Sequence, residues 1–156
     1  MHGLGFLFNL RAEYAEALAT ADRADALGSE VSEAFLLLAS CSARGQAYMM
    51  QGRPHDAREA LERALPEIDS ANAASEQNFI GFIADPRVTV LAILSLQLAH
   101  IGLVAEARER LEQAYARARQ LAQPMALMIT MWFDALCEIR FGDADRVAAL
   151  ADEMHS

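Results

Sequence analysis

An uncharged and mostly apolar run, VTVLAILSLQLAHIGLV, occupies residues 88–104 and leads directly into the charged amphipathic segment EARERLEQAYARARQ. Its seventeen residues fall short of the roughly 20 that a membrane-spanning helix needs, and they include Gln97 and His100. Asp85 and Pro86 precede the run, and these residue types suit the N-cap and the first position of a helix. The pattern therefore predicts a buried core helix of about four turns rather than a membrane span.

One spacing of small and apolar residues occurs four times along the chain. Residues 45–64 follow G-x2-Y-x3-G-x4-A-x3-L-x2-A, and identical steps fit from residues 5, 95 and 135. The central copies are Gly45, Tyr48, Gly52, Ala57, Leu61, Ala64 and Ser95, Leu98, Gly102, Ala107, Leu111, Ala114. The outer copies are Gly5, Phe8, Ala12, Ala17, Ala21, Ala24 and Ala135, Glu138, Gly142, Val147, Ala151, Met154. Such a period indicates helix-turn-helix units that bury their apolar faces by stacking.

The residue types at these steps fit helical hairpins. Small residues at the first and fourth steps let two helices approach closely, so we expect Gly45 and Ala57 at a close crossing. The third step falls where each first helix must end and where a positive φ favours glycine, as at Gly52, Gly102 and Gly142. Glu138 departs from the pattern, because the other copies have a large apolar residue at that step.

These steps resemble the tetratricopeptide repeat. The resemblance implies an all-α fold, a right-handed superhelix of about four helix-turn-helix repeats, with eight principal helices and no sheet. We expect a single domain over residues 1–156, with repeats at about 1–28, 30–75, 86–122 and 124–156 and an inserted loop at 76–85. The spacings of 40, 50 and 40 residues exceed the family's period, and Pro66 is expected to kink or shorten the second helix of the second repeat.

Composition removes several classes of function. The net charge of −9 argues against direct binding of nucleic acid or of an anionic membrane surface. All thirteen basic residues are arginine, so a P-loop, a pyridoxal Schiff base and a Ser-x-x-Lys site cannot form within this chain. The four histidines show no metal spacing, and we expect no catalytic residue, no metal site and no cofactor. The protein is therefore expected not to be an enzyme.

The cysteines and the N-terminal sequence bear on location. Cys41 and Cys137 lie in apolar helical patterns, where buried reduced thiols are a simpler expectation than a disulfide, although a disulfide stays open. The opening MHGLGFLFNL lacks the basic start and the cleavage site of a signal peptide. A cytoplasmic location is the expectation.

A closer resemblance comes from LRAEYAEAL (10–18), QGRPHDAREALERAL (51–65) and FIADPRVTVLAILSLQLAHIGLVAEARERLEQAYARARQLAQP (82–124). These segments resemble the C-terminal repeat region of bacterial regulators that couple a cyclase or DNA-binding domain to a signal-transduction ATPase. The matching positions are Asp85, Pro86, Val88, Gly102, Ala107 and Pro124. The resemblance implies a sensor or scaffold region that binds a protein or peptide partner. The alternative is a small-ligand sensor in which an apolar groove and the segment NFIGFIADP (78–86) enclose an effector.

In this repeat family the inner face belongs to the first helix of each hairpin. Carried over to this chain, the eight candidate partner-binding residues are Gln46, Met49, Met50, Leu96, His100, Trp132, Leu136 and Arg140. Further members of the same face are Ala39, Ser42, Thr89, Ala92, Ala99, Ile129 and Ile139. This groove is mostly apolar, and an exposed apolar patch marks an interface. The alternative is that these residues pack inside a tightly wound superhelix or against a missing repeat.

The two ends of the repeat array predict self-association. The first helix begins with the apolar segment GLGFLF, and the last carries Val147, Leu150 and Met154 on one side. A stacked repeat array exposes such faces unless a polar helix covers them. We expect the chain to pair through an end or through the groove, with a two-fold homodimer as the simplest closed form.

Overall fold

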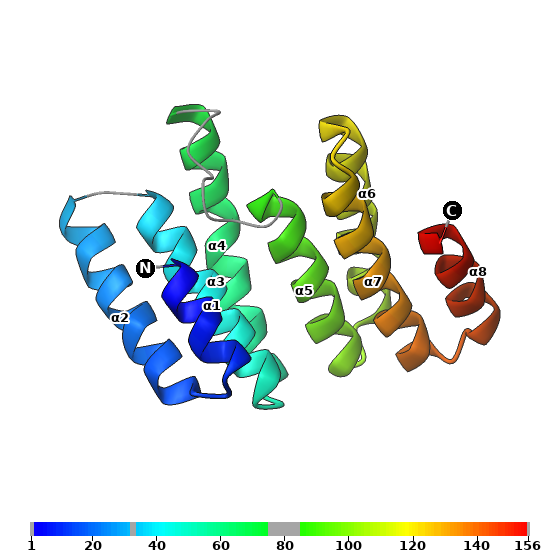
Figure 1. Cartoon of the computed structure of the whole chain (residues 1–156), viewed down its shortest axis with the longest axis horizontal. Coiled ribbons are helices and arrows are strands. Elements are labelled where there is room, and N and C mark those ends of the chain that lie inside the picture. The colour runs from blue at the N-terminus through cyan, green and yellow to red at the C-terminus, as the bar shows by residue number, and fades with distance from the viewer. Residues whose placement is uncertain (1, 32–33, 75–84, 156) are drawn as a thin grey trace. The chain divides into compact units, whose positions relative to one another are not determined.

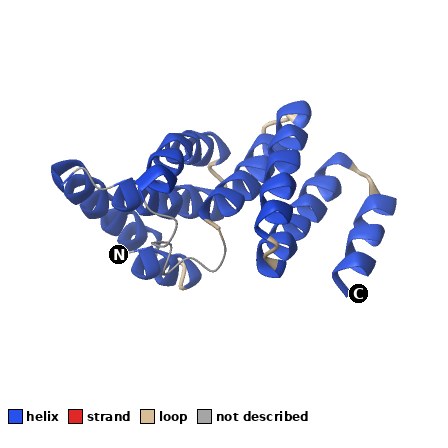
Figure 2. Ribbon diagram, turned by 90° about the horizontal axis from the view of Figure 1, so that it is seen from above, coloured by secondary structure: helices blue, strands red, loops and turns tan. Residues whose placement is uncertain are grey.

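The computed structural model describes residues 2–31, 34–74 and 85–155, and every regular element in these ranges is an α-helix (Figure 1 and Figure 2). The described ranges contain eight helices, which confirms the all-α prediction. None of these helices is long and apolar enough to cross a membrane. The predicted insertion at residues 76–85 lies outside the described residues except for Asp85.

The helices group into two compact units, Met1–Phe82 and Ile83–Ser156. The first unit contains α1 (His2–Leu10), α2 (Tyr14–Val31), α3 (Ala34–Met50) and α4 (Pro54–Ala74). Here α3 packs against α1, α2 and α4 (Figure 1). Alanines at the contacts let the helices lie close together, and the buried core includes Ala17, Ala21, Leu38, Ala47, Leu61, Ala64 and Ile68.

The second unit contains α5 (Pro86–His100), α6 (Val104–Leu121), α7 (Pro124–Phe141) and α8 (Ala144–His155). Its contacts repeat those of the first unit, since α7 packs against α5, α6 and α8, and α5 packs against α6. Most of the uncharged run, residues 88–100, lies in α5, and Asp85 caps this helix by accepting a hydrogen bond from the Val88 N–H at 3.1 Å. As predicted, this run is a core helix.

The turns between the two helices of the hairpins share a positive φ and one hydrogen bond in all four copies. The third step of the pattern has a positive φ in every copy: 59° at Ala12, 68° at Gly52, 81° at Gly102 and 82° at Gly142. The next N–H donates to a carbonyl five residues back at 2.9–3.0 Å, in the pairs Glu13–Phe8, Arg53–Tyr48, Leu103–Leu98 and Asp143–Glu138. This is the hydrogen bond of the Schellman motif, in which a residue with positive φ, usually glycine, ends a helix. The positive φ predicted at Gly52, Gly102 and Gly142 is therefore confirmed, and Ala12 in the first hairpin shares it.

The predicted close crossing of α3 and α4 is confirmed at Gly45. A Cβ atom at this position would lie 2.5 Å from Cδ2 and 2.6 Å from Cγ of Leu61, which is closer than carbon atoms approach in proteins. Leu61 and Ala57 are both fully buried. The absence of a side chain at position 45 is what lets Leu61 fill the space between the two helices.

Two local predictions need correction. α4 runs through Pro66 to Ala74, so the expected shortening of this helix is wrong, whereas the expected kink stays a prediction. The apolar side of α8 is not an exposed end face: Leu150 is fully buried against Met131 and Ala135, and Met154 packs against the same cluster. α8 folds back so that its apolar side meets α7, because this contact removes the apolar side chains from water. On α1, by contrast, Leu4, Leu7 and Leu10 are exposed.

Candidate functional site

The second unit has an exposed apolar surface along α7, which we call the α7 stripe: Met125, Met128, Trp132, Leu136 and Ile139. Met125 is 48% exposed, Met128 50%, Trp132 56% and Ile139 59%, whereas Leu136 is half-buried. These positions recur every three or four residues and therefore share one face of the helix over about 21 Å. Residue types of this kind are normally buried, so their exposure together marks a surface that another molecule can cover.

The other faces of α7 are held by its three neighbours. Cys137 faces Ser95 of α5, while Glu138 and Asp134 bond to side chains of α6. Met131 and Ala135 pack against Leu150 of α8. A helix that is apolar almost all round thus has three covered faces and one uncovered face, and the uncovered face is the stripe.

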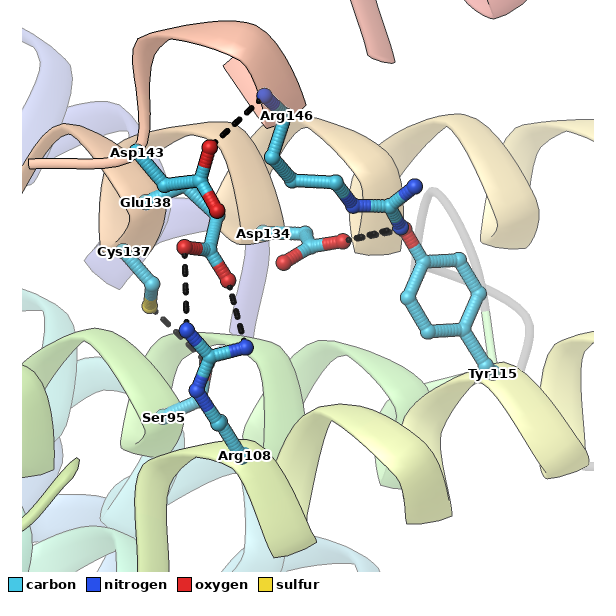
Figure 3. Close-up of polar contacts among 8 residues, drawn as sticks. All are labelled: Ser95, Arg108, Tyr115, Asp134, Cys137, Glu138, Asp143 and Arg146. Carbon is cyan, nitrogen blue, oxygen red and sulfur yellow. Dashed lines mark hydrogen bonds and ion pairs between the residues drawn. The ribbon is translucent and has the colours of Figure 1, made fainter. Parts of the chain in front are cut away.

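Polar contacts behind the stripe fix the position of α7 (Figure 3). The Glu138 side chain is only 2% exposed, and its two oxygens lie 3.0 and 3.1 Å from the guanidinium nitrogens of Arg108. Arg108 reaches in from α6 and also lies over the ring of Phe141, 4.9 Å from its centre. A two-pronged arginine–carboxylate contact is directional as well as strong. Arg108 thus provides the counterion that the buried Glu138 carboxylate requires at a repeat position that is apolar in the other copies.

A second contact joins three helices at Asp134 (Figure 3). Asp134 Oδ2 accepts a hydrogen bond from the Tyr115 hydroxyl at 2.9 Å and one from Arg146 at 3.1 Å. Burial, followed by the bond to Asp134, raises the pKa of Tyr115 well above its ordinary value. Burial lowers the pKa of Arg146, but the hydrogen bond and charge of Asp134 outweigh it and leave the pKa raised. Tyr115 therefore stays protonated and Arg146 charged, and both act as fixed donors.

The Cys137 thiol lies beside these contacts and lacks the properties of a reactive cysteine. Cys137 is fully buried, and its Sγ lies 3.7 Å from Ser95 Oγ, whose hydroxyl donates to the Ala92 carbonyl at 2.7 Å. Burial, and less strongly the nearby charges of Asp134 and Glu138, raises the pKa of Cys137 to about 11. A nucleophilic cysteine needs the opposite, an accessible thiolate with a lowered pKa. The network around Cys137 is suited to holding helices together.

The end of the stripe carries positive charge next to a histidine. Arg140 follows Ile139 on α7 and is exposed, and His100 is the last residue of α5. Partial burial, and then the charge of Arg140, lowers the pKa of His100. His100 is therefore neutral near pH 7, and Arg140 supplies the charge at this end of the stripe.

The structure separates the eight predicted groove residues. Trp132 and Leu136 belong to the α7 stripe, with Arg140 and His100 at its end. Leu96 on α5 is only 7% exposed and belongs to the core. Gln46, Met49 and Met50 lie on α3 in the first unit, where Met50 is 55% exposed and the other two are half-buried.

Sequence reasoning missed two members of the stripe, Met125 and Met128. The signal that would have found them is the helical period continued backward from Trp132 by four and then three residues. The alignment of repeats pointed instead to Ile129, which is half-buried.

No family model, no curated protein and no solved structure matches this chain. Within the ranges that the structure describes, no three His, Cys, Asp or Glu side chains gather in a way that could hold a metal ion. The geometry of the second unit is therefore the basis for a functional proposal.

Proposed function

We propose that this protein is a non-enzymatic interaction module that binds a helical segment of another polypeptide on the α7 stripe. The observation that carries the proposal is the stripe itself, where Met125, Met128, Trp132 and Ile139 are each about half exposed on one face. Tryptophan is enriched at the energetic centres of interfaces, and methionine adapts to different partner surfaces. An amphipathic partner helix with apolar residues at three- and four-residue intervals would match this spacing.

The polar contacts behind α7 support a binding role. Arg108–Glu138 and Arg146–Asp134 hold the helix to α6 and α8, so the stripe is presented in one position before a partner arrives. A surface that is already ordered loses less conformational entropy on binding, which favours affinity. The same contacts satisfy the buried acids, and the neighbouring Cys137 thiol, which faces Ser95, stays protonated. This arrangement serves rigidity better than catalysis.

We further propose that the four hairpins are tetratricopeptide-like repeats in the sensor or regulatory region of an ATPase-linked bacterial signalling or transcription regulator. The four turns, each with a positive φ and a hydrogen bond to the carbonyl five residues back, support the repeat assignment. The sequence resemblance over residues 10–18, 51–65 and 82–124 supports the regulatory setting. A cytoplasmic location belongs to the same proposal.

Site-specific photo-cross-linking in the host cell tests the interaction. A photoreactive residue replaces Met128 within the stripe, and a matched variant carries it at Ala148, an exposed position on α8. We expect a defined polypeptide to be cross-linked from position 128 and not from position 148. The same polypeptide, once purified, should shift the emission of Trp132 to shorter wavelength, and Trp132 is the only tryptophan in the chain.

Two results would contradict the proposal. Equal cross-linking from positions 128 and 148 would show that the stripe has no preference over ordinary surface. Cross-linking of small metabolites alone from position 128 would favour the effector-sensing alternative instead.

A further inference from the structure

The α7 stripe is symmetric about its central residue. Met128 and Leu136 lie four residues before and after Trp132, and Met125 and Ile139 lie seven residues before and after it. The symmetry extends to size, because each methionine is matched by a branched aliphatic side chain of similar volume: Met128 by Leu136 and Met125 by Ile139. A row with this property is complementary to itself when a second copy is turned by 180° about an axis through its centre.

We propose that the occupant of the α7 stripe is the α7 stripe of a second copy of this chain. The two α7 helices lie antiparallel across a two-fold axis that passes beside Trp132. Met125 of one copy then lies against Ile139 of the other, and Met128 lies against Leu136. This inference rests on the proposed function, since it names the partner for the same surface.

The amount of exposed surface fits such a pair. Four side chains that are each about half exposed offer on the order of 400 Å² of apolar area, within the roughly 300–600 Å² of the largest patch on a typical monomer. Two stripes together provide about 800 Å² of apolar area, whereas a standard interface buries about 1,600 Å² in total, of which about 60% is apolar. The stripe thus supplies most of the apolar surface that a stable dimer needs.

The charges along α7 permit the antiparallel arrangement. No charged residue lies between Met125 and Phe133, and the buried Asp134 and Glu138 are paired away from the stripe with Arg146 and Arg108. Arg140, eight residues after Trp132, falls opposite the uncharged Pro124, eight residues before it. Because the contact is apolar, the dimer should not weaken at high salt, in contrast to one held by exposed ion pairs.

The first test measures mass and fluorescence of the full chain as functions of concentration. We expect a dimer by light scattering and a shift of Trp132 emission to shorter wavelength as the dimer forms. Met128→Glu and Ile139→Glu place charges in the stripe and keep the tryptophan, and each should weaken dimerisation at least about 30-fold. Val104→Glu is the matched control, because Val104 is 40% exposed on α6 of the same unit and lies outside the stripe; it should dimerise normally.

The second test measures the register with engineered cysteines and mild copper-catalysed oxidation. Trp132→Cys should form a disulfide with its own counterpart, because both copies meet at the axis. Met125→Cys alone should not, because the two copies of residue 125 would be about 21 Å apart, beyond the roughly 7 Å between Cα atoms that a disulfide tolerates. A mixture of Met125→Cys and Ile139→Cys chains should yield the mixed disulfide.

Several results would overturn the inference. These are a monomer at all concentrations, a dimer that Met128→Glu and Val104→Glu affect equally, and a disulfide between two Met125→Cys chains. A monomer whose position 128 cross-links to a different polypeptide in the cell would refute the homodimer and leave the proposed function intact. A monomer that cross-links to no polypeptide would refute both.

Discussion

At the scale of single residues, the four turns show how one backbone requirement is met by different side chains. Gly52, Gly102 and Gly142 have positive φ, and a Cβ at any of them would meet nothing within 4 Å. The preference for glycine there comes from the backbone itself and not from crowding. Ala12 occupies the equivalent position in the first hairpin with a φ of 59°, and it carries the cost that the glycines avoid.

Ala12→Gly should therefore stabilise the protein, and Gly102→Ala should destabilise it, each by about 0.5–1 kcal/mol. The measurement is the free energy of unfolding from urea denaturation followed by circular dichroism. A loss of stability in Ala12→Gly would mean that the first turn does not share the geometry of the other three.

The lowered pKa of His100 has a second residue-scale consequence. Below its unfolded-state value of about 6.5, the unfolded chain takes up a proton more readily than the folded one, because burial and Arg140 oppose the charge on His100. The contribution of this histidine to stability is therefore present above pH 6.5 and declines as the pH falls toward the lowered pKa.

An NMR titration should place the pKa of His100 below 6.5. Arg140→Gln should raise it only part of the way back, because burial is the larger cause. The same variant should leave the chemical shifts of the α6 and α8 amides unchanged. A His100 pKa that does not respond to Arg140→Gln would show that the two side chains do not interact.

At the scale of elements, the Arg108–Glu138 contact between α6 and α7 should respond differently to the loss of each of its two residues. Glu138 is almost fully buried, whereas the side chain of Arg108 is 51% exposed. Loss of Arg108 leaves a buried carboxylate without its counterion, which is costly. Loss of Glu138 leaves an arginine that water can solvate, and an apolar side chain can then fill the repeat position.

Arg108→Met should destabilise the protein by about 2–3 kcal/mol, somewhat less than for a fully buried pair because Arg108 is partly solvated. Glu138→Leu should change the free energy of unfolding by no more than about 1 kcal/mol, and Arg108→Met combined with Glu138→Leu should recover most of the loss. Thermal and urea denaturation of the three variants provide the comparison. Equal destabilisation by both single changes would contradict the asymmetry.

The crossing of α3 and α4 gives a second element-scale prediction. Alanine is a better helix former than glycine by about 1 kcal/mol, yet Gly45→Ala should destabilise by about 1–3 kcal/mol, because the new Cβ meets Leu61 at 2.5 Å.

Leu61→Ala provides the control, since it removes the atoms that Gly45→Ala would meet. It should itself cost about 2–5 kcal/mol, but Gly45→Ala in that background should be neutral or stabilising. A double-mutant cycle by urea denaturation measures this coupling. Additive effects would show that residues 45 and 61 are not in contact.

At the scale of the whole molecule, each compact unit contains one buried cysteine. Cys41 lies on α3 in the first unit and Cys137 on α7 in the second, and both are thiols. The two residues therefore report separately on the integrity of the two units.

We expect neither thiol to react with an aromatic disulfide reagent in the native protein at pH 8, and one thiol per unit to react after unfolding. Cys41→Ala and Cys137→Ala assign each reaction to its unit.

For Cys137, whose pKa is raised to about 11 in the folded state, the thiol's contribution to stability is lost as the pH rises through the range between about 9 and 11, because only the unfolded thiol ionises there. Rapid native-state labelling of Cys137 would contradict its burial.

Residues near one another in the chain determined the helices and turns of this protein. The apolar run became α5 because Asp85 and Pro86 start it and Gly102 follows its end. The repeat register predicted the positive φ at Gly52, Gly102 and Gly142 correctly, because glycine stops and the helical period are set by short-range geometry. The proposed peptide groove used the same register, but register alone could not say which members of a face are covered.

Tertiary contacts decided which apolar residues are exposed. α5 and α7 are both apolar along most of their length, yet Leu96 is buried and Trp132 is exposed. The difference depends on which face of each helix its neighbours cover, and those neighbours come from other parts of the chain. For the same reason the sequence could not show that Arg108 would pair with Glu138, thirty residues away, or that α8 would turn Leu150 inward. Local sequence determines where a helix begins and ends, whereas only the packed structure determines which of its faces remains open to a partner.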